Sequence, residues 1–138
     1  MALRFLDTNV LVRFLTGDDP AKSGRALALL QKVDRGVEQL VTSPLVIFET
    51  IFTMERTYHA SREAIRKGLE AVISLRGLQL ANKRLYNDAF DLYLTLNISF
   101  ADAFNATFMQ ANRISEIYSW DTDFDKLPGI TRIEPAQS

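Results

Sequence analysis

With 138 residues, 47% of them hydrophobic and 24% charged, the chain fits a single globular domain over residues 1–138 rather than a disordered protein. It has no cysteine, which excludes disulfides, thiolate zinc sites and a cysteine nucleophile, and it shows neither a bilayer-spanning apolar run nor a signal-peptide pattern, so we expect a cytoplasmic protein that does not bind membranes. The formal net charge of −1 excludes a uniformly basic nucleic-acid binder, although acids clustered in one site and neutralised by metal would leave the remaining surface net positive.

Short strand-like runs alternate with helical runs along the first part of the chain. The apolar run Ala2–Asp7 predicts a buried strand that stops at Asp7, and a short helix follows over Val10–Leu15. The cluster Gly17–Pro20 predicts a turn. Ser43 and Pro44 predict a helix start, with serine as N-cap and proline at the first helical position. The remaining elements predicted in this part are helices over 21–35, 45–58 and 62–76, and strands over Gln39–Thr42 and Leu78–Ala81.

The second part of the chain continues the alternation. The pattern predicts helices over 83–97 and 99–112 and strands over Glu116–Trp120 and Ile130–Ile133. Such alternation predicts an α/β fold, a three-layer sandwich with a central parallel sheet of four to five strands flanked by helices. Ligands of such sheets bind at the carboxyl ends of strands, where Asp7 and Asp121 both lie.

Three acids lack the neighbouring cations that explain most other acids of this chain. Glu49 lies in the apolar segment LVIFETIF, on a helix predicted to be buried, and no cation stands three or four residues away. Asp102 also lacks such a cation, and Asp7 ends an apolar strand. An isolated buried carboxylate is costly unless it is paired, protonated or bound to a metal.

Each acid also has an ordinary structural explanation. Asp102 could complete a capping box with Ser99, Asp7 could be the N-cap of the following helix, and Asp121 could simply start a turn. Glu49 could pair with an arginine distant in sequence. Four such coincidences at these topological positions are less plausible than any one of them.

A cluster of carboxylates suits hard divalent cations such as Mg²⁺ or Mn²⁺, which prefer oxygen ligands. Without metal, the repulsion between the carboxylates would raise their pKa values. Nucleases use two such ions, about 3.5–4 Å apart, to activate a water and to stabilise the leaving oxygen. The acids therefore favour a metal-dependent nuclease.

Four segments of the chain resemble the ordered motifs of the PIN-domain family, specifically the VapC-type toxin ribonucleases of toxin–antitoxin pairs. The segments are FLDTNVLVRFL, TSPLVIFET, SFADAFNATFM and IYSWDTDFDKLPGI, and the resemblance covers nearly the whole chain. In this order they supply Asp7, Glu49, Asp102 and Asp121. The main departure is Trp120, a bulky residue just before Asp121, which we expect to pack rather than to contact a base.

The resemblance implies cleavage of RNA by an activated water, with Mg²⁺ or Mn²⁺ as cofactor and those four acids as catalytic residues that hold the metal. It implies supporting roles for Thr8, Asn9 and Ser119, and it makes Asp123 a further ligand or a residue just behind the ligands. It also implies a homodimer and a cognate antitoxin that blocks the site.

Basic residues could contact the RNA phosphates. Arg13 and Arg56 are better candidates than Lys22 and Arg25, because their segments lead away from Asp7 and Glu49. Solvated helix faces are the alternative explanation for all of them. The main alternative function is a non-catalytic PIN-like module that binds RNA or protein, which would be expected to have lost one or more acids. A related nuclease acting on DNA is a third possibility.

Overall fold

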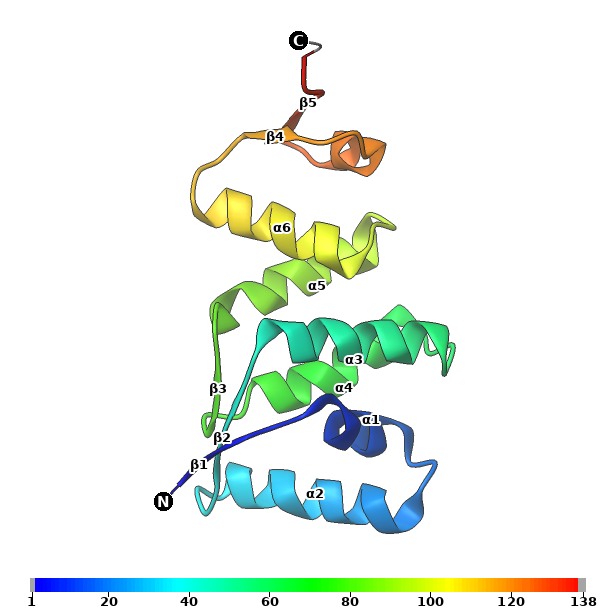
Figure 1. The fold of residues 1–138 in the computed structure, drawn as a ribbon, viewed down its shortest axis with the longest axis vertical. Coiled ribbons are helices and arrows are strands. Elements are labelled where there is room, and N and C mark those ends of the chain that lie inside the picture. Colours follow the sequence, from blue (N-terminus) through cyan, green and yellow to red (C-terminus); the bar gives the residue numbers. More distant parts are fainter. Residues whose placement is uncertain (1, 137–138) are drawn as a thin grey trace. The chain divides into compact units, whose positions relative to one another are not determined.

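The computed structural model describes residues 2–136 (Figure 1). The chain forms two compact units, Met1–Lys83 and Arg84–Ser138, and each unit has its own sheet. The expectation of one domain over residues 1–138 stays a prediction. Within residues 2–136, no helix is both long and apolar enough to cross a membrane.

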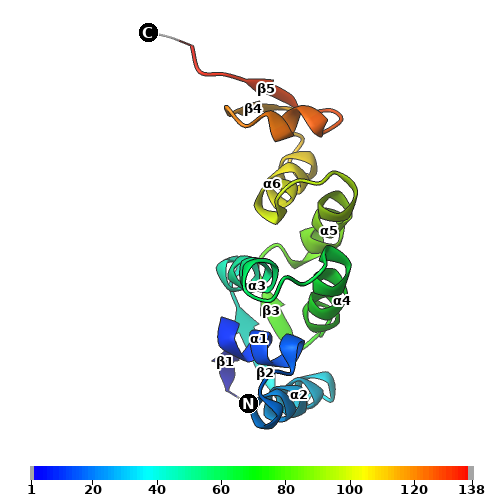
Figure 2. The same cartoon turned by 90° about the vertical axis from the view of Figure 1, so that its right-hand side faces the viewer.

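The first unit contains a parallel three-stranded sheet and four α-helices. Its elements are β1 (Leu3–Phe5), α1 (Thr8–Thr16), α2 (Pro20–Asp34), β2 (Gln39–Thr42), α3 (Pro44–Arg56), α4 (Arg62–Ile73) and β3 (Leu78–Leu80). The strand order is β1-β2-β3, with Leu3 opposite Gln39 and Leu40 opposite Leu78. Helix α1 packs against both α2 and α3, as the two views of Figures 1 and 2 show.

Local signals in the sequence set the helix starts of this unit. The side chains of Asp19, Ser43 and Ser61 each accept a hydrogen bond from a backbone N–H in the first turn of α2, α3 and α4. Proline follows the first two of these N-caps, where its missing N–H is not needed. The helix start predicted at Ser43 is therefore confirmed.

The second unit pairs two helices with a two-stranded parallel sheet. Its elements are α5 (Tyr86–Thr95), α6 (Phe100–Ala111), β4 (Glu116–Tyr118), the 3-10 helix η2 (Thr122–Lys126) and β5 (Thr131–Ile133), and the short 3-10 helix η1 (Lys83–Leu85) leads into it. Aromatic contacts join α5 to α6, with ring centroids 4.8 Å apart for Phe90 and Phe100 and 5.1 Å apart for Tyr86 and Phe104. This aromatic core supports the first turn of α6.

The sheet differs from the predicted four to five strands. Five strands form at the predicted positions and all their pairings are parallel, but β1, β2 and β3 make one sheet while β4 and β5 make another. Apolar runs bounded by turns encode the existence of a strand. The choice of its partner depends on contacts distant in sequence, which those runs do not encode. The three-layer arrangement stays a prediction.

The first strand is exposed, whereas the sequence predicted a buried strand. Leu3 and Phe5 are 46% and 59% exposed, and burial begins only at Leu6, which is 2% exposed. β1 lies at the edge of the three-stranded sheet, with a hydrogen-bonded neighbour on one side only. An apolar run does not reveal whether its strand is central or at an edge.

Gly77 lies where the chain entering β3 closely approaches the end of α2. A Cβ atom at this position would lie 2.8 Å from Cγ1 of Val33 and 3.2 Å from the carbonyl oxygens of Val33 and Glu38. Because these neighbours are backbone and a stiff β-branched side chain, we expect Gly77→Ala to lower the free energy of unfolding by about 1–3 kcal/mol. Urea denaturation measures this change. The control, Gly24→Ala in α2, has open space at Cβ and should instead raise stability by roughly 0.5–1 kcal/mol; equal effects would contradict the prediction.

Candidate active site

Asp7 stands between β1 and α1. Its backbone is extended, with φ −93° and ψ 159°, and it occupies the N-cap position of α1, but its side chain makes no capping hydrogen bond. The N-cap explanation therefore accounts for the backbone of Asp7 and not for its carboxylate. Thr8 follows, only 8% exposed, and its Oγ1 is buried without a hydrogen-bond partner within residues 2–136. An unsatisfied buried hydroxyl is costly, and the exposed Asp7 beside it offers a carboxylate to a ligand.

Glu49 is exposed, so the expectation that it is buried is wrong. It lies on α3, whose buried face consists of Val46, Ile47, Thr50, Ile51 and Met54. Leu45 and Phe52, one helical turn to either side of Glu49, are 72% and 53% exposed. An apolar helix sequence does not require burial all round, because folded proteins expose many apolar side chains. The case for Glu49 therefore rests on its position rather than on the cost of burying it.

Asp7 and Glu49 share one cleft of the first unit, with a volume of ≈ 270 Å³. The packing of α1 against α3 brings them together, since Asp7 precedes α1 and Glu49 belongs to α3. The cleft is lined by Asp7, Thr8, Asn9, Val12, Arg13, Glu49, Thr53 and Tyr58. Two of the predicted catalytic acids, Asp7 and Glu49, therefore line the same cleft as the predicted supporting residues Thr8 and Asn9.

Two further residues of this cleft, Arg13 and Tyr58, donate hydrogen bonds to the carboxylate of Asp18. The Asp18 carboxylate accepts hydrogen bonds from the Thr16 hydroxyl at 2.8 Å, the Tyr58 hydroxyl at 2.9 Å and the Arg13 guanidinium at 2.8 Å. These donors lower the pKa of Asp18 to about 2. The same hydrogen bonds raise the pKa values of Tyr58 and Arg13. From the sequence, Asp18 was predicted only as part of a turn and Tyr58 was not predicted at all, because no spacing signal links residues so far apart.

Asp18→Asn is expected to lower the Tm and to remove an acid-sensitive part of the stability. The pKa of Asp18 in the folded protein, about 2, lies below its usual 3.8, so the stabilisation is fully present above about pH 4 and is lost as the pH falls toward 2. Thermal melting followed by circular dichroism between pH 2 and 6 checks this. The wild-type Tm should fall more steeply below pH 4 than that of the variant, whereas the exposed control Asp34→Asn should keep the wild-type slope. Parallel curves for Asp18→Asn and wild type would rule out the linkage.

The second unit holds a cluster of three acids: Asp102, Asp121 and Asp123. One carboxylate oxygen from each lies within 4.8 Å of the others. Asp102 belongs to the first turn of α6, where its backbone N–H donates to Oγ of the N-cap Ser99 at 3.1 Å. Asp121 precedes η2, and its Oδ1 accepts the backbone N–H of Asp123 at 2.9 Å. The predicted capping and turn interactions thus exist, and they help to place the acids beside one another.

The electrostatics of this acidic cluster favour a bound cation. Burial raises the pKa of Asp102 first, and the charges of Asp121 and Asp123 raise it further, against an opposing hydrogen bond with Ser99. Lys126 Nζ lies 3.0 Å from Asp123 Oδ1 and offsets part of the negative charge. Three carboxylates facing one ammonium leave net negative charge, and oxygen ligands suit Mg²⁺ or Mn²⁺.

Ser119 has a geometric basis for its predicted supporting role. Its Oγ accepts the backbone N–H of Asp121 at 2.9 Å, and its carbonyl oxygen accepts a hydrogen bond from Arg132 at 3.1 Å. Arg132 also forms ion pairs with Asp125 and Glu134, at 3.1 and 3.0 Å. This network fixes the turn that carries Asp121. Arg132 was not predicted from the sequence, because its partners are identifiable only once β4 and β5 are paired.

The sequence also led to expectations for Arg56, as a contact to RNA phosphate, and for Trp120, as a packed residue. The guanidinium of Arg56 lies 4.2 Å from the ring centroid of Phe52, and Arg56 does not line the cleft that holds Asp7. Its contact with RNA phosphate stays a prediction. Trp120, which we expected to pack, is 70% exposed.

The family of the chain follows from a comparison with known families. Residues 4–130 match the family model described as PIN domain. No curated protein matches the chain.

Two solved structures are similar over nearly the whole chain. The toxin VapC20 of Mycobacterium tuberculosis, described as cleaving the sarcin–ricin loop, is 20% identical, with 97% of this chain and 100% of that chain covered and a TM-score of 0.40. VapBC2 of Rickettsia felis, bound to a DNA fragment from its promoter, is 14% identical, with 96% and 98% covered and a TM-score of 0.39. The family assignment rests on the family model alone.

Proposed function

This chain belongs to the PIN domain family, and from that premise we propose that it is a metal-dependent endoribonuclease, the toxin of a type II toxin–antitoxin pair. The observation that supports the proposal most directly is the acidic cluster of Asp102, Asp121 and Asp123, with oxygens within 4.8 Å of one another. Oxygen-only sites of this kind are typical of enzymes that hydrolyse phosphodiester bonds with divalent metals.

We propose that Asp7 and Glu49 are catalytic acids as well, alongside Asp102, Asp121 and Asp123. Asp7 and Glu49 both line the ≈ 270 Å³ cleft of the first unit. Asp7 is exposed and makes no capping hydrogen bond, so capping does not occupy its carboxylate, and the adjacent Thr8 lines the same cleft.

The donor set fits a divalent cation, because it consists of carboxylates whose repulsion a cation would relieve. We propose Asp7, Glu49, Asp102 and Asp121 as metal ligands, with Asp123 as a further one. When bound, Mg²⁺ or Mn²⁺ would neutralise the acids and lower the pKa of a water that attacks the phosphodiester.

The protein's own contribution to this chemistry is to hold the acids in fixed positions. The Ser99 hydroxyl oxygen accepts the backbone N–H of Asp102 at 3.1 Å, and the Ser119 hydroxyl oxygen accepts the backbone N–H of Asp121 at 2.9 Å. Asp121 in turn accepts the N–H of Asp123. A backbone held by such bonds keeps the acids it carries close to their working positions, which is how a preorganised site gains rate.

The resemblance of the four sequence segments to VapC-type toxins supports a proposal about the molecules that this chain binds. We propose an RNA substrate, a second copy of the chain in a homodimer, and a cognate antitoxin that blocks the acids. The non-catalytic alternative would be favoured by a missing acid, and all four are present in the sequence.

The test of the proposed function is metal-dependent RNA cleavage by the purified chain. Single-stranded RNA and ribosomal RNA are incubated with Mg²⁺, with Mn²⁺ and with EDTA, and the products are separated on denaturing gels. We expect cleavage with either metal, none in EDTA, and recovery when excess Mg²⁺ is added back, because the clustered acids need a cation. Intact RNA under all metal conditions would favour the non-catalytic module, and cleavage in EDTA would exclude a metal mechanism.

A further inference from the structure

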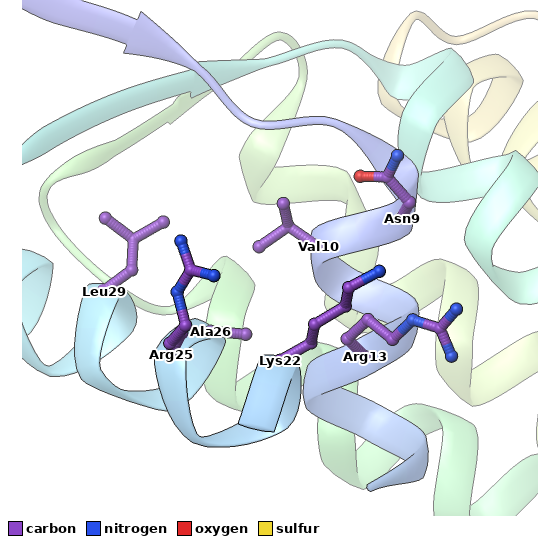
Figure 3. A pocket seen from close by; sticks show the side chains of 7 residues that line it. All are labelled: Asn9, Val10, Arg13, Lys22, Arg25, Ala26 and Leu29. Atoms are coloured by element: carbon purple, nitrogen blue, oxygen red, sulfur yellow. The ribbon is translucent and has the colours of Figure 1, made fainter. Parts of the chain in front are cut away.

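A second, larger hollow of the first unit lies between α1 and α2, with a volume of ≈ 460 Å³ (Figure 3). We call it the α1–α2 groove. Its polar lining consists of Asn9 and Arg13 from α1 and of Lys22 and Arg25 from α2. Its apolar lining includes Val10 and Leu29. Figure 3 shows Lys22 and Arg25 extending from α2 beside these residues of α1.

The α1–α2 groove is positively charged although the whole chain has a net charge of −1. Three cations line it and, among the residues that the structure describes, no acid does. Lys22 and Arg25 stand three residues apart on one face of α2, and neither has an ion-pair partner within residues 2–136. Arg13 is paired with Asp18 at 2.8 Å. The groove therefore offers two uncompensated cations to an anion.

The α1–α2 groove adjoins the cleft that holds Asp7 and Glu49. Asn9 and Arg13 line both hollows. An extended molecule lying in the groove would therefore lie beside the part of α1 that also lines the cleft of these two acids. A single strand of nucleic acid has this shape and carries a negative charge at every residue.

We propose that the α1–α2 groove binds the phosphodiester backbone of the substrate strand next to the scissile bond. This inference rests on the proposed function. Lys22 and Arg25 contact phosphates, while Val10 and Leu29 face the less polar sugars and bases. An acidic peptide would match the cations equally well, but the adjoining cleft with Asp7 and Glu49 favours the substrate strand. Such contacts give affinity without sequence choice, so the target sequence is selected elsewhere.

The test is RNA binding by the double variant Lys22→Gln/Arg25→Gln. A fluorescein-labelled single-stranded 12-mer RNA is titrated in EDTA, which separates binding from cleavage, and the anisotropy is followed from about 50 to 300 mM KCl. We expect Kd near 150 mM salt to rise roughly tenfold, and the slope of log affinity against log salt to fall by about 1.4, or about 0.7 for each lost phosphate contact.

The matched control removes two cations of the same unit that do not line the groove, in Arg35→Gln/Lys67→Gln. An equal loss of affinity in this control would overturn the proposal, because general charge would then explain the effect. Tighter binding of a 12-residue polyglutamate peptide than of RNA, dependent on Lys22 and Arg25, would overturn it in favour of an acidic protein partner. Melting curves check folding, and the two single variants replace the double variant if its Tm falls.

The two proposals fail separately in these experiments. Wild-type cleavage together with unchanged RNA affinity in the groove variant would overturn the groove and leave the proposed function standing. Absence of cleavage, together with lost affinity and a reduced salt slope in the groove variant, would support the groove and overturn the nuclease.

Discussion

Asp102→Asn is expected to lower the rate of RNA cleavage by about 100-fold or more while raising the Tm of the metal-free protein. The rate falls because an amide cannot replace a charged carboxylate at a preorganised site. The Tm rises by a few degrees because the charged form of Asp102 is disfavoured in the folded protein. Burial, followed by the charges of Asp121 and Asp123, raises the pKa of Asp102 above its usual 3.8.

The gain in Tm of the metal-free Asp102→Asn variant should increase as the pH rises. When folding raises the pKa of an acid, the folded state is destabilised as the pH rises through and above the usual value, since the charge must form in an unfavourable place. Asparagine carries no charge at any pH. The stability advantage of Asp102→Asn should therefore be largest near neutral pH and should vanish in acid, where wild-type Asp102 is also neutral.

Initial cleavage rates in Mg²⁺ and melting curves in EDTA at pH 3.5 and 7.5 measure the two effects of Asp102→Asn. Mg²⁺ should raise the Tm of the wild type and raise that of the variant less, because a ligand stabilises the state that binds it. Asp88→Asn is the matched control, since Asp88 lies in the first turn of α5 as Asp102 lies in that of α6. A lower Tm for Asp102→Asn in EDTA would favour a purely capping role for this residue.

Asp7→Asn and Glu49→Gln are each expected to lower the cleavage rate by about 100-fold or more with little change in Tm. The rate should fall because we propose both residues as catalytic acids, and an amide cannot replace their charge. Stability should hold because Asp7 makes no capping hydrogen bond and Glu49 is exposed. A loss of activity at constant Tm separates a role in chemistry from a role in folding.

The control for these two variants is Glu63→Gln, which removes an exposed acid from α4 of the same unit. Rates are measured with saturating Mg²⁺ and with Mn²⁺, and folding is checked by circular dichroism. Wild-type cleavage by Asp7→Asn or by Glu49→Gln would show that the substituted acid takes no part in catalysis. A rate loss in Glu63→Gln would point to general charge instead.

The acids that cap or start helices illustrate how structural and catalytic roles can coincide. Asp121 accepts the N–H of Asp123, and Ser99 accepts the N–H of Asp102, so ordinary capping bonds build the acidic cluster. In the sequence, capping and metal binding were competing explanations for Asp102 and Asp121. In the structure, the capping bonds fix the backbone turns that carry the acids we propose as ligands.

The sequence by itself determined the elements that carry the site, because their signals are local. Ser43 with Pro44 sets the start of α3, and Ser99 sets the start of α6, so Glu49 and Asp102 could be assigned to helices. The helix predicted over residues 62–76 forms as α4 (Arg62–Ile73), which buries Ile65, Leu69, Val72 and Ile73. The four motif segments were sufficient to indicate the family, which the match over residues 4–130 confirms.

Only the tertiary structure decided which elements meet and what they expose. Strand partners, the exposure of Glu49 and the bond between Tyr58 and Asp18 all depend on residues far apart in the chain. The α1–α2 groove likewise exists because Asn9 and Arg13 of one helix face Lys22 and Arg25 of another. Local patterns report the preferences of the backbone and of helix faces, whereas a cleft or a charged groove is made by the packing of two elements against each other.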